Sequence, residues 1–307
     1  PLPAWDDTLA RYSASLSPLF ANRREHTASC AAVAAFRNGP GPALHAALVA
    51  RDAEDAATGA FPHFYFEEEW DAGYLGARCP NTVHMNPTFF LTTPKAEAVD
   101  AAGGTGGVLR KAASFLSASA RWLVHARAGG LHSDGLDMSR LGRVMGTANI
   151  PGEHVDTLAF HGATSTHVVV QAGGGQFFRV DILTQDGAAA LPSADILAAL
   201  EEVQRLASSS INSSSSSKDS GDGSSYSASG GGIGVLTSMP RTDWFHARQH
   251  LLSLSPDNGE SLAQIDSALL MVALDENKTD DLTERCRAGL HGIDASTRSD
   301  RWWDKMQ

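Results

Sequence analysis

Apolar residues recur at helical spacing through the first part of the chain. Apolar side chains stand three or four positions apart in a set that starts at Leu9 and in the stretches 30–36 and 43–57. A turn cluster at 38–42 separates the last two stretches. A longer set with the same period covers 108–128. Because this spacing gathers apolar side chains on one face, it predicts four amphipathic helices.

The pattern changes in the middle of the chain. Residues 166–171 are short and β-branched, three glycines follow at 173–175, and apolar and polar residues return over 176–182. Two such runs around a glycine turn predict a β-hairpin. The apolar runs at 234–238 and 269–274 predict two further short strands, the second of them buried.

Helical patterns alternate with these strands. They cover 193–206, about 241–252 and 261–267. Alternating helices and short apolar strands predict a layered α/β fold. Residues 208–232 are mostly serine and glycine, a composition with nothing to bury, so we expect a disordered insertion there.

Composition narrows the class of protein. The chain has 307 residues, of which 42% are hydrophobic and 19% are charged, so it can build a core. It carries 24 Lys+Arg against 35 Asp+Glu, a net charge of −11. Without a basic stripe, a nucleic-acid groove is excluded as a function. The sequence also lacks an apolar run of 18 residues, so we expect no transmembrane segment.

Local motifs do not identify a catalytic centre. The sequence contains no GxSxG elbow, no GxxxxGK[ST] phosphate loop and no HExxH zinc site. His246 and His250 have the spacing of metal ligands, but no carboxylate or cysteine completes a set nearby, so a solvated helix face is favoured and no metal site is predicted. His154 lies two residues before Asp156, which allows a base oriented by a carboxylate, although a polar loop is favoured.

An aromatic pair follows three consecutive glutamates. Trp70 and Tyr74 are four residues apart, so on a helix their rings share one face. Such pairs usually pack in a core. An aromatic face beside carboxylates can also hold a trimethylammonium group by cation–π attraction. The residues alone leave both interpretations open.

Short motifs along nearly the whole chain occur in the order of a known family. They are Gly73-Tyr74-Leu75, Pro151-Gly152 with Asp156-Thr157, Gly175-Gln176-Phe177-Phe178, Leu236-Thr237-Ser238 with Arg241 and Trp244, Leu290-His291-Gly292, and Arg301-Trp302-Trp303-Asp304-Lys305. In this order they resemble the carnitine/choline O-acyltransferase family. Each motif is weak alone, whereas their collinear order is specific.

The resemblance implies a fold and a domain organisation. The family fold has two similar α/β domains related to chloramphenicol acetyltransferase. The resemblance implies that residues 1–90 form an N-terminal helical segment that packs on a second domain missing from this chain. It also implies that residues 91–307 form the first two-layer, CoA-dependent acyltransferase domain, incomplete at its C-terminus.

The resemblance also implies where the chemistry lies. In the family, the catalytic histidine follows the segment that Arg301 opens here, and this chain stops at Gln307, so we assign no catalytic residue. Tyr74 matches a family tyrosine that lines the carnitine pocket, and Trp70 is the second substrate-binding candidate. The implied partners are carnitine and acyl-CoA or CoA as co-substrate, with no bound cofactor.

One function and two alternatives follow from the resemblance. The chain is expected to be the N-terminal portion of a carnitine O-acyltransferase, inactive without the rest. The alternatives are a non-catalytic scaffold or binding fragment of the family and a choline O-acetyltransferase. The implied location is mitochondrial or peroxisomal, with the cytosol as a further option.

Overall fold

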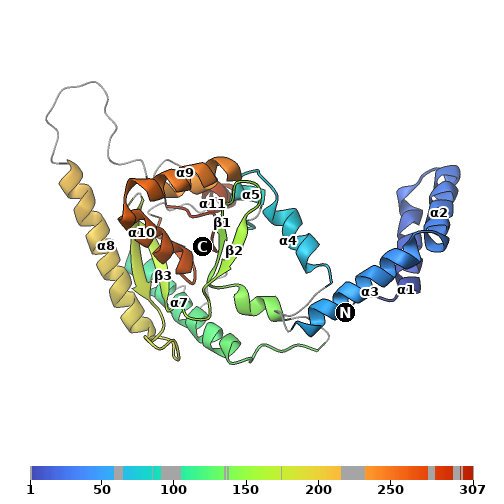
Figure 1. Ribbon diagram of the computed structural model, residues 1–307. Coiled ribbons are helices and arrows are strands. Elements are labelled where there is room, and N and C mark those ends of the chain that lie inside the picture. The colour runs from blue at the N-terminus through green and yellow to red at the C-terminus, as the bar shows by residue number, and fades with distance from the viewer. Residues whose placement is uncertain are drawn as a thin grey trace, which may run out of the picture. The chain divides into compact units, whose positions relative to one another are not determined.

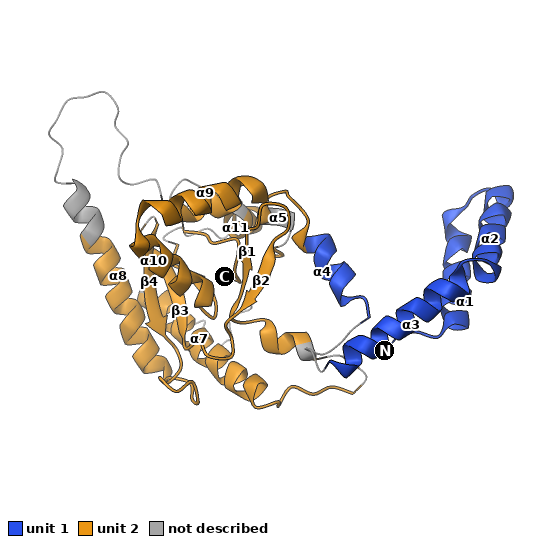
Figure 2. Cartoon of the chain, viewed as in Figure 1, with its two compact units in different colours: residues 1–74 blue, residues 75–307 orange. Residues whose placement is uncertain are grey.

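The chain folds into two compact units. The computed structural model describes residues 2–58, 65–84, 86–90, 105–134, 136, 138–173, 175–215, 232–275, 281–292, 298 and 300–306 (Figure 1). Residues 1–74 form an N-terminal unit and residues 75–307 form an α/β unit (Figure 2). In the described ranges, no helix combines the length and the apolar character needed to cross a membrane.

The described part of the N-terminal unit is helical, as the spacing of its apolar residues predicts. Its elements are α1 (Trp5–Leu16), η1 (Ser17–Leu19), α2 (Arg23–Asn38), α3 (Gly41–Ala57) and most of α4 (Glu67–Leu75). Helix α1 buries Leu9 and Leu16 and gives way to η1, in which Pro18 occupies one of the first positions. The predicted helices in this part of the chain are therefore confirmed.

A close approach between α1 and α3 depends on a glycine. The ring of Trp5 lies 5.8 Å from the ring of Phe36 and 5.3 Å from that of His45. A Cβ atom at Gly41 would lie 2.5 Å from the Trp5 ring. Only glycine leaves space for the indole at the start of α3.

A three-stranded sheet forms the centre of the α/β unit. Strand β3 (His167–Ala172) pairs antiparallel with β4 (Gln176–Asp181) and parallel with β5 (Met271–Ala273), which gives the order β4-β3-β5. The predicted hairpin is confirmed, and the second predicted strand is present as β5, in which Met271 is buried and the other two residues are half-buried. A second sheet pairs β1 (Thr147–Ile150) with β2 (Thr157–Phe160). The sequence analysis missed it, because β2 is short and largely exposed.

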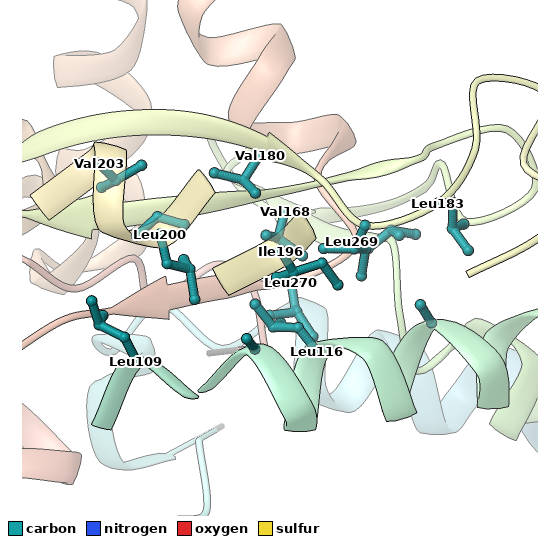
Figure 3. Packing of buried hydrophobic residues seen from close by; sticks show 14 of the residues in the cluster. Leu109, Leu116, Val168, Val180, Leu183, Ile196, Leu200, Val203, Leu269 and Leu270 are labelled. Carbon is teal, nitrogen blue, oxygen red and sulfur yellow. The ribbon is translucent and has the colours of Figure 1, made fainter. Parts of the chain in front are cut away.

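Helices cover both faces of the three-stranded sheet. Val168 and Val170 pack with α7 (Thr105–Arg127) and α8 (Ser193–Ser215), as the close view in Figure 3 shows for part of this cluster. Val169 points the other way and packs with α9 (Arg241–Leu254) and α10 (Pro256–Ser267). Successive strand residues alternate between faces, so the fully buried β3 needs cover on both. The expected two-layer arrangement is thus wrong for this sheet, which lies between two helical layers.

Two local expectations are corrected by the structure. Residues 234–238 do not form a strand but most of η3 (Ile233–Ser238), because the Thr237 hydroxyl donates to the carbonyl of Gly234 at 2.7 Å and closes a tight turn. The serine-rich segment 208–232 begins as helix, since α8 continues to Ser215. The hydroxyls of Ser208 and Ser209 donate to carbonyls of the preceding turn, a bond that serine can make inside a helix. The expected disorder over 216–231 lies outside the described residues.

The boundary between the units lies after Tyr74, whereas the sequence analysis places it after residue 90. The intervening segment is bonded to the α/β unit. The Leu75 carbonyl accepts from the Asp156 N–H at 2.9 Å, and Asn86 donates to the Trp303 carbonyl at 3.1 Å. The segment includes α5 (Asn81–His84), and the unit also contains η2 (Ser139–Arg143) and α11 (Leu282–His291).

Candidate functional site

The aromatic pair lies on α4 in the N-terminal unit. The rings of Trp70 and Tyr74 are 5.2 Å apart with an interplanar angle of 45°, and Phe66 meets Trp70 edge-on at 6.3 Å. Trp70 is 51% exposed and Tyr74 is 41% exposed. Among the described residues the pair is therefore an open aromatic surface rather than part of a core.

Carboxylates adjoin this aromatic surface. Residues 67–69 are all glutamate and occupy the first turn of α4, where the helix dipole favours negative charge. Glu69 pairs with Arg51 at 2.8 Å, and the hydrogen bond from that guanidinium lowers the pKa of the Glu69 carboxyl. Aromatic faces beside ionised carboxylates attract an organic cation.

A buried ion cluster lies in the α/β unit. The Arg241 side chain is fully buried and donates to Asp156 at 2.6 Å and to Asp304 at 2.5 Å. Trp244 Nε1 and Asn81 Nδ2 also donate to Asp304, at 2.7 and 3.2 Å. Buried charges persist when they are paired and hydrogen-bonded, and this cluster meets that condition.

The bonds within the ion cluster give Asp156 a structural role. Its Oδ1 accepts from Arg78 and from the Gly152 N–H, at 2.9 and 3.2 Å, while its Oδ2 accepts from Arg241. His154 is exposed. Asp156 therefore holds two arginines and a turn in place, and the structure does not bring it together with His154 as a catalytic pair.

Other histidines have structural surroundings. His246 and His250 are exposed on α9, and no group in the described part of the chain could hold a metal ion. His167 is buried, contacts the Gln264 carbonyl at 2.9 Å, and has its pKa lowered by burial. His291 ends α11, with its side chain outside the described residues.

Two neighbouring charged groups at the C-terminal end of the chain titrate abnormally. Burial raises the pKa of Asp304 to about 6, against the opposing attraction of Arg241. Burial lowers the pKa of Lys305 to about 8. The Lys305 ammonium donates to the carbonyls of Asp266 and Thr147 at 2.8 and 3.1 Å, and thereby links α10 to β1.

The Lys305 pKa predicts a pH dependence of stability. In the folded chain the ammonium loses its proton near pH 8, whereas in the unfolded chain it keeps the proton to near its ordinary value of 10.5. The free energy of unfolding should therefore rise between pH 8 and 10.5, by at most about 1.4 kcal/mol per pH unit. Urea unfolding of the wild-type chain and of Lys305→Met at pH 7 to 10 isolates this contribution. A wild-type-minus-variant difference that stays flat or falls with pH contradicts it.

The sequence analysis missed the ion cluster, although its family motifs contain the residues. Asp156, Arg241 and Asp304 come from three different motifs. Along the chain, Arg241 lies 85 residues from Asp156 and 63 residues from Asp304. The signal that could have found the cluster is that each of these three motifs contains at least one charged residue. A buried cluster draws its members from distant segments, so spacing along the chain does not reveal it.

Comparisons with known proteins place the chain in a family. The family model for choline/carnitine O-acyltransferase matches residues 1–307. The mitochondrial carnitine O-palmitoyltransferase 2 of Homo sapiens is 27% identical over 342 residues, covering 99% of this chain and 46% of that protein. The peroxisomal carnitine O-octanoyltransferase of Mus musculus is 26% identical over 322 residues, covering 99% and 47%. The chain spans about half the length of the curated relatives it matches. The match along every residue shows that this chain belongs to the choline/carnitine O-acyltransferase family.

Proposed function

We propose that the chain forms the N-terminal half of an enzyme that transfers an acyl group between CoA and the hydroxyl of carnitine. The observation that carries this proposal is that relatives named as carnitine acyltransferases align along 99% of the chain. Their names include mitochondrial and peroxisomal proteins, so we propose one of these two locations. The fold related to chloramphenicol acetyltransferase, and a second domain that completes it, belong to the same proposal.

The chain's own part in the reaction is binding and positioning. Trp70 and Tyr74 hold the trimethylammonium group of carnitine against their rings, and the neighbouring carboxylates add electrostatic attraction. The ion cluster around Arg241 fixes residues 300–306 against the rest of the α/β unit. The base that removes the hydroxyl proton and the groups that bind CoA lie outside residues 1–307 in this proposal, so the isolated chain is inactive.

Release of CoA measures the proposed reaction. The assay uses the protein as isolated from its source cells, acetyl- and palmitoyl-CoA as donors, and L-carnitine or choline as acceptor. Thiol release that depends on carnitine supports the proposal, and release that depends on choline alone identifies a choline acyltransferase instead. Absence of release with both acceptors identifies a non-catalytic member of the family. The 307-residue chain alone is expected to release no CoA above background.

Substitution of Tyr74 tests the acceptor site. Loss of one cation–π contact costs about 0.5–2 kcal/mol, so Tyr74→Ala and Trp70→Ala are each expected to raise the KM for carnitine about twofold to thirtyfold. The KM for acyl-CoA should stay unchanged. Tyr12→Ala is the matched control, because Tyr12 is a 55% exposed tyrosine on α1. Equal KM values for carnitine in all three variants and the wild type would remove Trp70 and Tyr74 from the site.

A further inference from the structure

One arginine closes the C-terminal end of α4, the helix that carries the aromatic pair. Arg78 Nη2 donates to the carbonyl of Leu75, the last residue of α4, at 2.5 Å, and its Nε donates to the Gly76 carbonyl at 3.3 Å. The last carbonyls of a helix have no partner inside the helix, and the dipole there favours a cation. Arg78 therefore stabilises the chain directly after Tyr74.

The same guanidinium also bonds to the ion cluster. Arg78 Nη1 donates to the Gly152 carbonyl at 2.9 Å, and Nη2 donates to Asp156 Oδ1 at 2.9 Å. The Asp156 side chain is almost fully buried, and its other oxygen accepts from Arg241. The Arg78 carbonyl accepts from the Arg241 N–H, at the start of α9, at 3.0 Å. Arg78 thus links the end of α4 to the interior of the α/β unit.

The acceptors of Arg78 in the α/β unit are themselves held in place. Gly152 and Asp156 belong to one tight turn, in which the Gly152 N–H donates to Asp156 Oδ1 at 3.2 Å. A Cβ atom at Gly152 would overlap the Val155 carbonyl, so only glycine fits this turn. A group that is held by fixed partners can in turn hold a binding residue in position.

Helix α4 has no buried side chain to fix it. It is nine residues long, and none of its residues is fully buried. Isolated helices of this length are marginal in water, and packing of an apolar face usually stabilises them. Near its first turn, Arg51 pairs with Glu69 at 2.8 Å. Because apolar burial does not position α4, the bonds at its ends carry that role.

We propose that Arg78 is a positioning residue for the proposed carnitine site. It acts through the end of α4, where it fixes the backbone that follows Tyr74, and it is assigned no contact with carnitine. A planar guanidinium can bond to several acceptors at once in a fixed geometry, which an ammonium cannot reproduce. The inference rests on the proposed function, in which Tyr74 holds the trimethylammonium group.

Amide hydrogen exchange of the 307-residue chain tests the positioning without the reaction. Arg78→Gln is expected to speed exchange at the last turn of α4 about tenfold, through loss of charge-assisted bonds to the helix end. Arg127→Gln is the matched control, because Arg127 is a half-buried arginine of α7 that donates to three backbone carbonyls. It should leave exchange in α4 unchanged. Equal exchange of α4 in Arg78→Gln and in the wild type overturns the proposal.

Kinetics of the complete protein test the consequence for carnitine. Arg78→Gln is expected to raise the KM for carnitine about threefold to tenfold and to leave the KM for acyl-CoA unchanged, whereas Arg127→Gln should change neither. In a Tyr74→Ala background, Arg78→Gln should raise the KM for carnitine much less, because the ring that it positions is gone. A general loss of stability would raise it equally in both backgrounds, and that result contradicts the proposal.

A second variant and the wild-type assay separate the possible failures. Arg78→Lys keeps a cation beside Asp156 but not the planar fork, so its exchange and its KM for carnitine should lie between those of Arg78→Gln and the wild type. It replaces Arg78→Gln in both measurements if that variant does not fold. If the wild-type protein releases no CoA with carnitine, the role of Arg78 in carnitine binding falls with the proposed function. The exchange measurement then still decides whether Arg78 positions α4.

Discussion

Replacing Arg241 with methionine is expected to lower the free energy of unfolding of the α/β unit by about 3–5 kcal/mol. The substitution keeps most of the buried volume but leaves Asp156 and Asp304 without their shared cation. Both carboxylates have side chains that are only 2% exposed, so water cannot replace the guanidinium. Urea unfolding of the chain, followed by tryptophan fluorescence at pH 7, measures the loss.

An exposed ion pair provides the control for this prediction. Arg205 pairs with Glu202 at 2.5 Å, and both side chains are more than half exposed, so Arg205→Met should cost less than about 1 kcal/mol. Asp156 keeps its bond to Arg78 in this variant, so adding Asp304→Asn to Arg241→Met removes the carboxylate that has lost its cation and should restore part of the loss. A small effect of Arg241→Met, or a double variant less stable than the single one, contradicts the cluster's role.

Replacing Trp302 with alanine is expected to cost about 3–5 kcal/mol, because it empties a large volume in a packed core. Trp302 is fully buried and meets Phe177 and Trp244 edge-to-face, with ring centroids 5.7 and 6.0 Å away. Edge-to-face pairs add stability beyond the area they bury. Thermal unfolding of the variant should show a lower melting temperature for the α/β unit.

The matched control for Trp302→Ala is Trp70→Ala. Trp70 is half exposed and belongs to the N-terminal unit, so its loss should leave the unfolding of the α/β unit unchanged. If Trp302→Ala melted at the wild-type temperature, residues 300–306 would not be part of the core. A large loss instead means that this segment is a structural member of the α/β unit.

Both predictions concern the same short segment. Asp304 bonds to α9 through Arg241, Trp302 packs on β4 through Phe177, and the Met306 carbonyl accepts from the Met271 N–H of β5 at 2.8 Å. Residues 300–306 are therefore anchored to a helix and to two strands of the sheet. In the proposed enzyme, this anchoring fixes the position of residues 300–306, from which any following residue would extend.

Elements with a strong local pattern could be predicted from the sequence. The β3–β4 hairpin follows from β-branched runs around a glycine turn, and α7 follows from a long apolar period. The strand predicted for residues 234–238 is wrong, because an apolar run of that length fits a turn of helix as well as a strand. The Thr237 hydroxyl favours the helical turn, because it donates to the Gly234 carbonyl and accepts from the Trp303 N–H. The partner in the second of these bonds is 66 residues away.

The candidate site shows the same division. The sequence alone determined that Trp70 and Tyr74 share a helix face, and the order of the motifs determined the family, because both are properties of position along the chain. Only the tertiary structure decided that the two rings are exposed and that Asp156, Arg241 and Asp304 meet in the interior. Exposure and ion pairing depend on which distant segments come to lie against a residue. No local pattern of hydrophobic and polar positions contains information about which distant segments these are.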